Sequence, residues 1–338
     1  MDLNMVWFLL VGVLIIGYAI LDGFDLGVGV LHLFARSEEE RRVHINAIGP
    51  VWDGNEVWLL TAGGALFAAF PVVYATVFSG YYIALMLLLT ALIFRAVSME
   101  FRGKVDSPGW RRTWDWAFGL GSLLPAVLFG VAFGNILRGI PLDAAHNYAG
   151  TFFTLLNPYA VLIGVLSLTL FTMHGALYLA LKTAGPLQAR IVRWISPLWM
   201  ATVVLYLVAT LGTMFVSPFL FERMLSNPLF YVLFVLLLGS CIMIPVAAKA
   251  GTYGRAFFAS SVMIAMMIGL SAVSLFPRLV PALDDPPNSL TIYNASSSEA
   301  TLWVMFIIAL IGMPLVIAYT IFIYRAFRGK VVIGTDSY

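Results

Sequence analysis

Long apolar stretches alternate with short polar connections along almost the whole chain. A helix needs roughly 20 predominantly apolar residues to cross the hydrocarbon core of a bilayer, which is about 30 Å thick. Nine stretches of the sequence meet this requirement, near residues 5–34, 52–71, 76–96, 116–137, 156–181, 194–216, 228–249, 257–277 and 302–327. The pattern therefore predicts a membrane protein with nine spans.

The spans are expected to be helices because they are evenly apolar, whereas the strands of a membrane barrel alternate. A helix also satisfies its own backbone hydrogen bonds inside lipid. Of the 338 residues, 61% are hydrophobic and 11% charged, against about 45–50% and 25% in soluble domains. We predict an all-α integral membrane fold in which residues 1–338 form one polytopic domain.

Motifs of soluble enzymes are missing from the sequence, among them phosphate loops, dinucleotide fingerprints, nucleophile elbows and zinc-ligand spacings. The single cysteine, Cys241, lies inside an apolar stretch, so the chain forms no internal disulfide and no thiolate metal cluster. The first stretch lacks the basic start and cleavage site of a secretory signal, and we expect it to remain as the first span. We expect neither a bound metal nor a nucleic-acid partner.

Basic residues indicate the orientation of the chain. Sixteen of the nineteen Lys and Arg residues follow the first, third, fifth, seventh or ninth stretch, and Arg95 and Arg102 are placed after the third. Only Arg138, Arg223 and Arg278 fall on the other side. The positive-inside rule then puts the N-terminus outside and the C-terminus in the cytoplasm, which requires an odd number of spans.

Pairs of glycines lie four residues apart in two of the apolar stretches, at Gly23 and Gly27 and at Gly130 and Gly134. Small residues at this spacing let the backbones of neighbouring membrane helices approach closely. We expect helix packing contacts at both pairs.

Four acidic residues lie within the first span or at the start of the second. Asp22 and Asp25 lie in LDGFDLGVG, and Asp53 and Glu56 lie in PVWDGNEVW. An acid in the middle of a membrane helix costs at least about 2.5–3.5 kcal/mol, so these residues need a compensating environment. Each pair is spaced three residues apart and shares a helix face. Both pairs fall in the cytoplasmic half, where they are expected to share one polar layer.

Two interpretations of these acids stay open. In the first, carboxyl groups and water form a proton entry path from the cytoplasm, with Asp25 and Asp53 as its first candidates. In the second, Asp53 caps the second helix, and the other acids pair with Arg41, Arg42 or backbone amides.

Histidines are the residues most often used as haem or metal ligands. His44 and His146 are expected in loops, His32 at the cytoplasmic end of the first span, and His174 within the fifth. This distribution does not resemble a paired-histidine haem site. His174 is interpreted as a hydrogen-bonded core histidine, with cofactor ligation as the alternative.

Several segments together resemble subunit II of the cytochrome bd-type quinol oxidases, and the similarity covers essentially the whole chain. They are LDGFDLGVGVL, ERR, INAIGPVWDGNEVWLLTAGGALFAAFPVVYA, GWRRTWDWAFGLGS, GVAFGNILRGIP, FTMHGALYL and NASSSEATLWVM. The resemblance implies two four-helix bundles, at about 1–140 and 150–280, plus one peripheral helix at about 300–328. It also implies a multi-pass protein of the bacterial inner membrane.

The same resemblance implies that the chain pairs with a larger subunit I, which carries haems b and d and oxidises quinol. The heterodimer would reduce dioxygen to water, and this chain would ligate no haem. By position, Asp25 and Asp53 match acids that line a proton route, and Trp58 matches a tryptophan near a lateral oxygen entrance. Read from the residues alone, Trp58 has a second interpretation, an anchor at the membrane interface. A bound quinone with unassigned contacts and a small single-helix accessory subunit are further expectations.

Two rival functions are considered beside the oxidase subunit. A proton-coupled secondary transporter also uses intramembrane acids, although the sequence shows no convincing internal repeat of the kind expected. A purely structural membrane subunit would use its acids only for capping and pairing.

Overall fold

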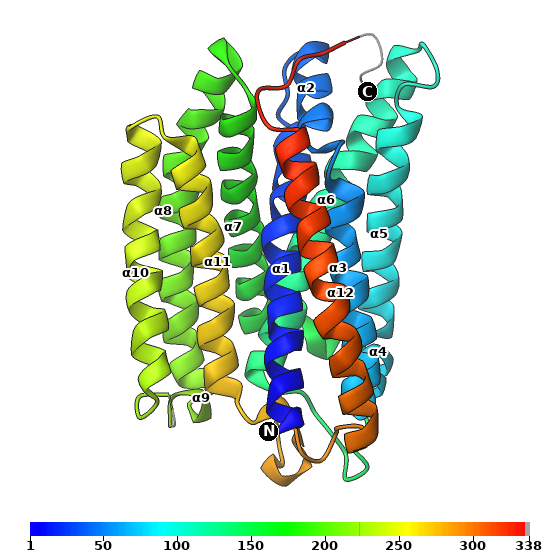
Figure 1. Ribbon diagram of the computed structural model, residues 1–338, viewed down its shortest axis with the longest axis vertical. Coiled ribbons are helices and arrows are strands. Elements are labelled where there is room, and N and C mark those ends of the chain that lie inside the picture. Colours follow the sequence, from blue (N-terminus) through cyan, green and yellow to red (C-terminus); the bar gives the residue numbers. More distant parts are fainter. Residues whose placement is uncertain (223, 335–338) are drawn as a thin grey trace.

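The computed structural model describes residues 1–222 and 224–334 and is almost entirely helical (Figure 1). The α-helices are α1 (Leu3–His32), α2 (Glu38–Ile48), α3 (Trp52–Ala69), α4 (Pro71–Gly80), α5 (Tyr82–Phe101), α6 (Pro108–Arg138), α7 (Pro158–Lys182), α8 (Gly185–Val216), α9 (Phe219–Glu222), α10 (Pro228–Lys249), α11 (Tyr253–Leu275) and α12 (Glu299–Ala326). Short 3₁₀ turns η1 (Phe152–Leu156) and η2 (Pro286–Asn288) and one antiparallel strand pair, β1 (Arg278–Val280) with β2 (Leu290–Thr291), complete the described part. The predicted all-α class is confirmed.

Eight helices in the described part are long and apolar enough to cross a membrane. They are α1, α5, α6, α7, α8, α10, α11 and α12. The predicted second span corresponds to α3, an 18-residue helix that packs beside α1 and carries three polar residues, Asp53, Asn55 and Glu56, in its first turns. The start of α1 and the end of α12 lie at opposite ends of the long axis (Figure 1).

The third span begins later than the sequence pattern predicted. The apolar run after α3 first forms α4, which starts with Pro71 at its first position, as helices often do. The chain leaves helical geometry at Tyr81, and α5 then runs from Tyr82 to Phe101. Arg95 therefore lies inside a membrane helix, and its assignment to the cytoplasmic connection was wrong.

α1 lies in the middle of the fold and packs against α3, α6, α7 and α11 (Figure 1). A Cβ atom added to Gly27 would lie 1.9 Å from the carbonyl oxygen of Phe171, and one on Gly175 would lie 2.5 Å from the carbonyl carbon of Gly27. On α6, a Cβ at Gly130 would lie 2.6 Å from the carbonyl oxygen of Ile163. The close approach predicted at both glycine pairs is confirmed, and α7 is the shared neighbour.

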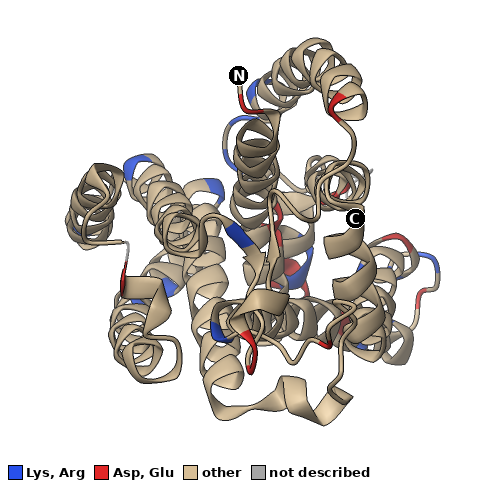
Figure 2. Ribbon diagram, turned by 90° about the horizontal axis from the view of Figure 1, so that it is seen from below, with Lys and Arg blue, Asp and Glu red and all other residues tan. Residues whose placement is uncertain are grey.

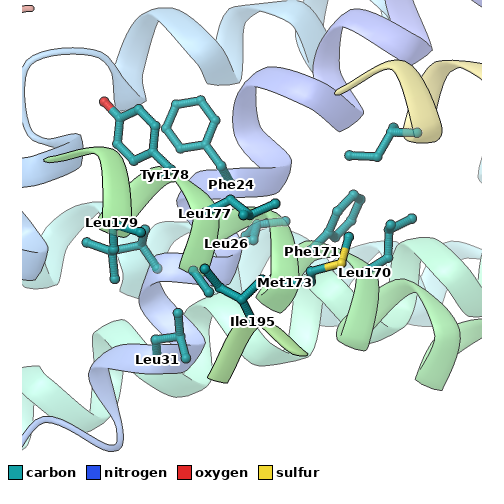
Figure 3. Packing of buried hydrophobic residues seen from close by; sticks show 14 of the residues in the cluster. Phe24, Leu26, Leu31, Leu170, Phe171, Met173, Leu177, Tyr178, Leu179 and Ile195 are labelled. Carbon is teal, nitrogen blue, oxygen red and sulfur yellow. The ribbon is translucent and has the colours of Figure 1, made fainter. Parts of the chain in front are cut away.

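The α1–α7 contact forms the centre of the largest apolar core (Figure 3). Phe24 and Leu26 of α1 and Met173, Leu177 and Leu179 of α7 are all fully buried there. Lipid tails are as apolar as these side chains, so association of membrane helices depends on packing of this kind. The core fixes the rotation of α1 and thereby the direction in which its acids point.

Candidate functional site

A buried arginine is the centre of the polar layer. Arg95 of α5 is fully buried and donates two hydrogen bonds to the carboxylate of Asp22 on α1, at 2.9 and 2.5 Å. The same guanidinium lies 3.9 Å from Asp25 Oδ2 and 3.4 Å from Glu56 Oε1. Three of the four predicted acids thus face one cation. Seen along the long axis, acidic and basic segments meet inside the helix assembly (Figure 2).

The carboxylate of Asp25 is held from one side only. Its Oδ2 accepts a 2.7 Å hydrogen bond from Nδ2 of Asn55, which also donates to the carbonyl of Leu21 at 3.1 Å. The hydroxyl of Tyr324, on α12, donates to Asn55 Oδ1 at 3.0 Å. Among the described residues, Oδ1 of Asp25 and Oε1 of Glu56 have no hydrogen-bond partner although they are buried. These two buried oxygens are therefore not occupied by a hydrogen bond within the described part of the chain.

Asp53 lies outside this layer. It is exposed in the first turn of α3, and its Oδ1 accepts a 2.8 Å hydrogen bond from the backbone N–H of Gly54. A carboxylate at this place is favourable because the N-terminus of a helix carries partial positive charge. Asp53 stands one turn before Glu56, whose side chain is 25% exposed, so the two form a polar edge between the surface and the buried arginine.

A second charged cluster closes the end of the bundle near α2, and sequence reasoning missed it. Arg102 donates from Nε to Asp115 at 2.6 Å and from its two terminal nitrogens to Glu38 at 2.9 and 2.8 Å. His32 Nε2 lies 2.7 Å from Asp115, and Arg41 Nε lies 3.6 Å from the same carboxylate. The cluster ties α1, α2, α5 and α6 together. The expected partner Arg41 thus meets Asp115, whereas the partner of Asp22 is Arg95.

His44 is not a loop residue, contrary to the prediction. It lies in α2 and is buried. Burial lowers the pKa of His44 to about 3, and the charges of His32 and Arg190 add to the effect. The side chain is therefore neutral at physiological pH.

His174 is a hydrogen-bonded core residue, as interpreted from the sequence. Its Nδ1 lies 2.6 Å from the hydroxyl of Ser260, and its Nε2 lies 3.0 Å from the carbonyl oxygen of Ile20. The ring stacks on Phe257 with centroids 4.5 Å apart. Within the described ranges, no three His, Cys, Asp or Glu side chains come together in a way that could hold a metal ion.

Trp58 covers a glycine of α1. A Cβ atom on Gly17 would lie 2.2 Å from Cε3 of Trp58, so the indole needs a bare backbone beside it. The contact fixes one edge of the indole against α1.

The fold and the charged layer define an all-helical, multi-pass membrane protein that buries ionisable groups between its helices. The model of the family "Cytochrome bd terminal oxidase subunit II" matches residues 3–327, and the chain belongs to this family. The probable cytochrome oxidase subunit 2 of Haemophilus influenzae is 40% identical, covering 97% of this chain and 95% of that protein. The cytochrome bd-I ubiquinol oxidase subunit 2 of Escherichia coli K12 is 37% identical over the same shares, and the cytochrome bd ubiquinol oxidase subunit 2 of Bacillus subtilis is 39% identical over 98% and 97%.

A solved structure shows the same fold. The bd oxidase from Geobacillus thermodenitrificans matches with a TM-score of 0.81 at 17% identity, over 97% of this chain and 99% of that one. Family membership makes the chain one subunit of a cytochrome bd terminal oxidase, an oxidoreductase of the bacterial inner membrane, and implies a partner subunit I. It favours the oxidase interpretation over the transporter.

Proposed function

We propose that this chain is the scaffold and proton-uptake subunit of a complex that oxidises quinol and reduces dioxygen to water. In this proposal haems b and d belong to subunit I, and no haem is ligated here. The relatives named as ubiquinol oxidase subunits and the resemblance in sequence support the reaction. A bound quinone and a single-helix accessory subunit stay predictions of the resemblance.

In the proposed topology α3 crosses the membrane as well as the eight longer helices, which makes nine spans. The N-terminus lies outside and α2 lies in the cytoplasm. One bundle would comprise α1, α3, α5 and α6, the other α7, α8, α10 and α11, and α12 would be the peripheral helix. In the first group α1 packs on α3 and α6, and α5 packs on α6; in the second, α7 packs on α8, α8 on α10 and α10 on α11. These contacts and the placement of α12 beside α1 and α3 support this division.

The observation that carries the proton route is the excess of buried carboxyl groups. Asp22, Asp25 and Glu56 face a single guanidinium, that of Arg95, so full ionisation would leave a surplus of two negative charges. A surplus of buried charge is expensive in a low-dielectric interior, and binding a proton removes it. A group of carboxyls that must hold protons, one of them reaching the surface, can also pass them on.

The proposed route runs from exposed Asp53 to Glu56 and then to Asp25. Asp22 is not a carrier in this route, because both of its carboxylate oxygens accept hydrogen bonds from Arg95. This pairing favours a structural role for Asp22, in which it anchors the cation around which the other acids gather.

The proposal is tested in the assembled complex with variants that replace an acidic residue by its uncharged amide. Asp25→Asn and Asp53→Asn are each expected to lower oxygen consumption, Asp25→Asn by about tenfold or more, because a positioned proton carrier contributes at least this much. Asp143→Asn is the matched control, since Asp143 is an exposed carboxylate in the connection between α6 and α7. Haem absorption measures assembly. Unchanged oxygen consumption by normally assembled Asp25→Asn and Asp53→Asn would favour the purely structural alternative.

A further inference from the structure

We infer that Asn55 and Tyr324 are positioning residues that hold the Asp25 carboxyl group with Oδ1 open to an incoming proton. The inference rests on the proposed proton route and adds two residues to it. It follows from the hydrogen bonds of Asn55, which join α1, α3 and α12 at one point.

Every hydrogen-bonding group of the Asn55 amide has a partner. Its two N–H groups point to Leu21 O and Asp25 Oδ2, and its oxygen accepts from the hydroxyl of Tyr324. An amide rotated by 180° would aim its N–H groups at a hydroxyl and its oxygen at a carboxylate, losing two of these bonds. The network therefore fixes a donor, and not an acceptor, against Asp25.

This donor keeps Asp25 away from Arg95. Asp25 Oδ2 is 3.9 Å from the guanidinium, beyond hydrogen-bonding distance, whereas Asp22 is bound at 2.5 and 2.9 Å. Without the 2.7 Å bond from Asn55, a small rotation would bring Asp25 Oδ2 into the same grip. A carboxylate paired with arginine in that way releases and accepts protons poorly, because the pairing favours its charged form.

Two tyrosines, Tyr324 and Tyr178, lie beside Phe24. Among the described residues, Tyr324 hydrogen-bonds to Asn55 and Tyr178 does not. The ring of Tyr324 lies edge-on to Phe24 at 6.5 Å, and Phe24 stacks on Tyr178 at 4.0 Å. The hydroxyl of Tyr178 donates elsewhere, to the carbonyl of Ala47 at 3.1 Å. Two tyrosines therefore lie near the same carboxyl group with different hydrogen-bond partners, which supplies a matched pair for an experiment.

The test compares variants of the complete oxidase complex that change no charge. Tyr324→Phe removes one oxygen, Asn55→Leu removes the amide, and Tyr178→Phe is the control. The other charged groups that face Asp25, namely Asp22, Glu56 and Arg95, stay as they are. The quantities to measure are kcat and KM for quinol and the carboxyl C=O bands in the redox-induced infrared difference spectrum. The band that disappears in Asp25→Asn is assigned to Asp25.

Tyr324→Phe is expected to lower kcat about two- to tenfold, the range for loss of one hydrogen bond, with KM unchanged and the Asp25 band shifted. Tyr178→Phe should leave kcat and the band unchanged. Because Tyr324 acts through Asn55, Tyr324→Phe should cause no further loss when added to Asn55→Leu. If Asn55→Leu does not assemble, Tyr324→Phe alone decides.

Failure of the inference can be told apart from failure of the proposed function. Wild-type kcat and an unmoved band in Tyr324→Phe, alongside an impaired Asp25→Asn, would overturn the positioning role and leave the proton route intact. Wild-type kcat in Asp25→Asn itself would overturn both.

Discussion

Arg95 of α5 binds both carboxylate oxygens of Asp22 on α1, and neither side chain is exposed to solvent. Removal of one member of a buried ion pair costs far more than the pair contributes, because the other charge is left uncompensated. The relationship makes Arg95 the residue on which the whole polar layer depends.

Arg95→Leu is expected to lower the stability of the assembled complex by about 3–5 kcal/mol or to block assembly, since three carboxyl groups lose their cation. The midpoint of thermal unfolding and the yield of haem-containing complex measure this. The double variant Asp22→Leu with Arg95→Leu should recover part of the loss. Arg111→Leu is the control, because its ion pair with Asp106 is exposed and exposed pairs contribute little. Equal behaviour of Arg95→Leu and Arg111→Leu would refute this role.

We predict that the folded chain loses stability in acid because His44 is buried as a neutral side chain. Its pKa is lowered by burial to about 3 in the folded chain, whereas an unfolded histidine titrates at about 6.5. As the pH falls, the unfolded state therefore binds a proton at His44 before the folded state does. The contribution of neutral His44 to the free energy of unfolding is complete above pH 6.5 and falls progressively towards pH 3.

His44→Asn should reduce the dependence of the unfolding midpoint on pH between 6.5 and 5. His146→Asn is its control: His146 is a half-buried residue with φ of 62°, a conformation that asparagine tolerates. A slope that is the same in wild type and His44→Asn would show that His44 is not buried as a neutral group.

Close packing of α1 on α7 should make Gly27 intolerant of any side chain. Gly27→Ala would put a Cβ atom 1.9 Å from the backbone oxygen of Phe171, and backbone cannot move aside as a side-chain tip can. We expect a loss of about 1–3 kcal/mol or more. Gly239→Ala, at a helix position with no atom within 4 Å, should be neutral or stabilising. Comparable unfolding midpoints for the two variants would contradict the described contact.

Trp58 is proposed to border the oxygen entrance. Trp58→Phe is expected to change the apparent KM for oxygen with little change in kcat at saturating oxygen, because access is altered and the reaction is not. Trp303→Phe, on α12 and 43% exposed, serves as the control. An unchanged KM for oxygen in Trp58→Phe would remove this residue from the entrance.

The sequence pattern located most helices because each crossing demands a long apolar run, and little else in a protein produces one. It failed around Pro71–Gly80, because a short apolar helix at the end of a span has the same composition as the span itself. It also placed Arg95 in a connection. A charged residue normally marks the end of a span, and its partner Asp22 lies on another helix, where composition gives no sign of the pairing.

The acids were predictable as a group and not in their individual contacts. Spacing brought Asp22, Asp25 and Glu56 correctly into one layer, but it could not show that Asp53 faces outward. The cluster of Arg102, Asp115 and His32 was missed because these residues come from separate helices. The sequence TWDW, with an acid between two tryptophans, was the available signal for Asp115.

The most direct test of the central claim is proton uptake by the assembled oxidase during a single reaction of the fully reduced complex with oxygen, recorded by a pH-indicating dye alongside haem absorption. The account predicts that Asp25→Asn slows proton uptake about tenfold or more while oxygen binding to the partner's haem keeps its rate. Proton uptake by Asp25→Asn at the rate of wild type and of Asp143→Asn would contradict it.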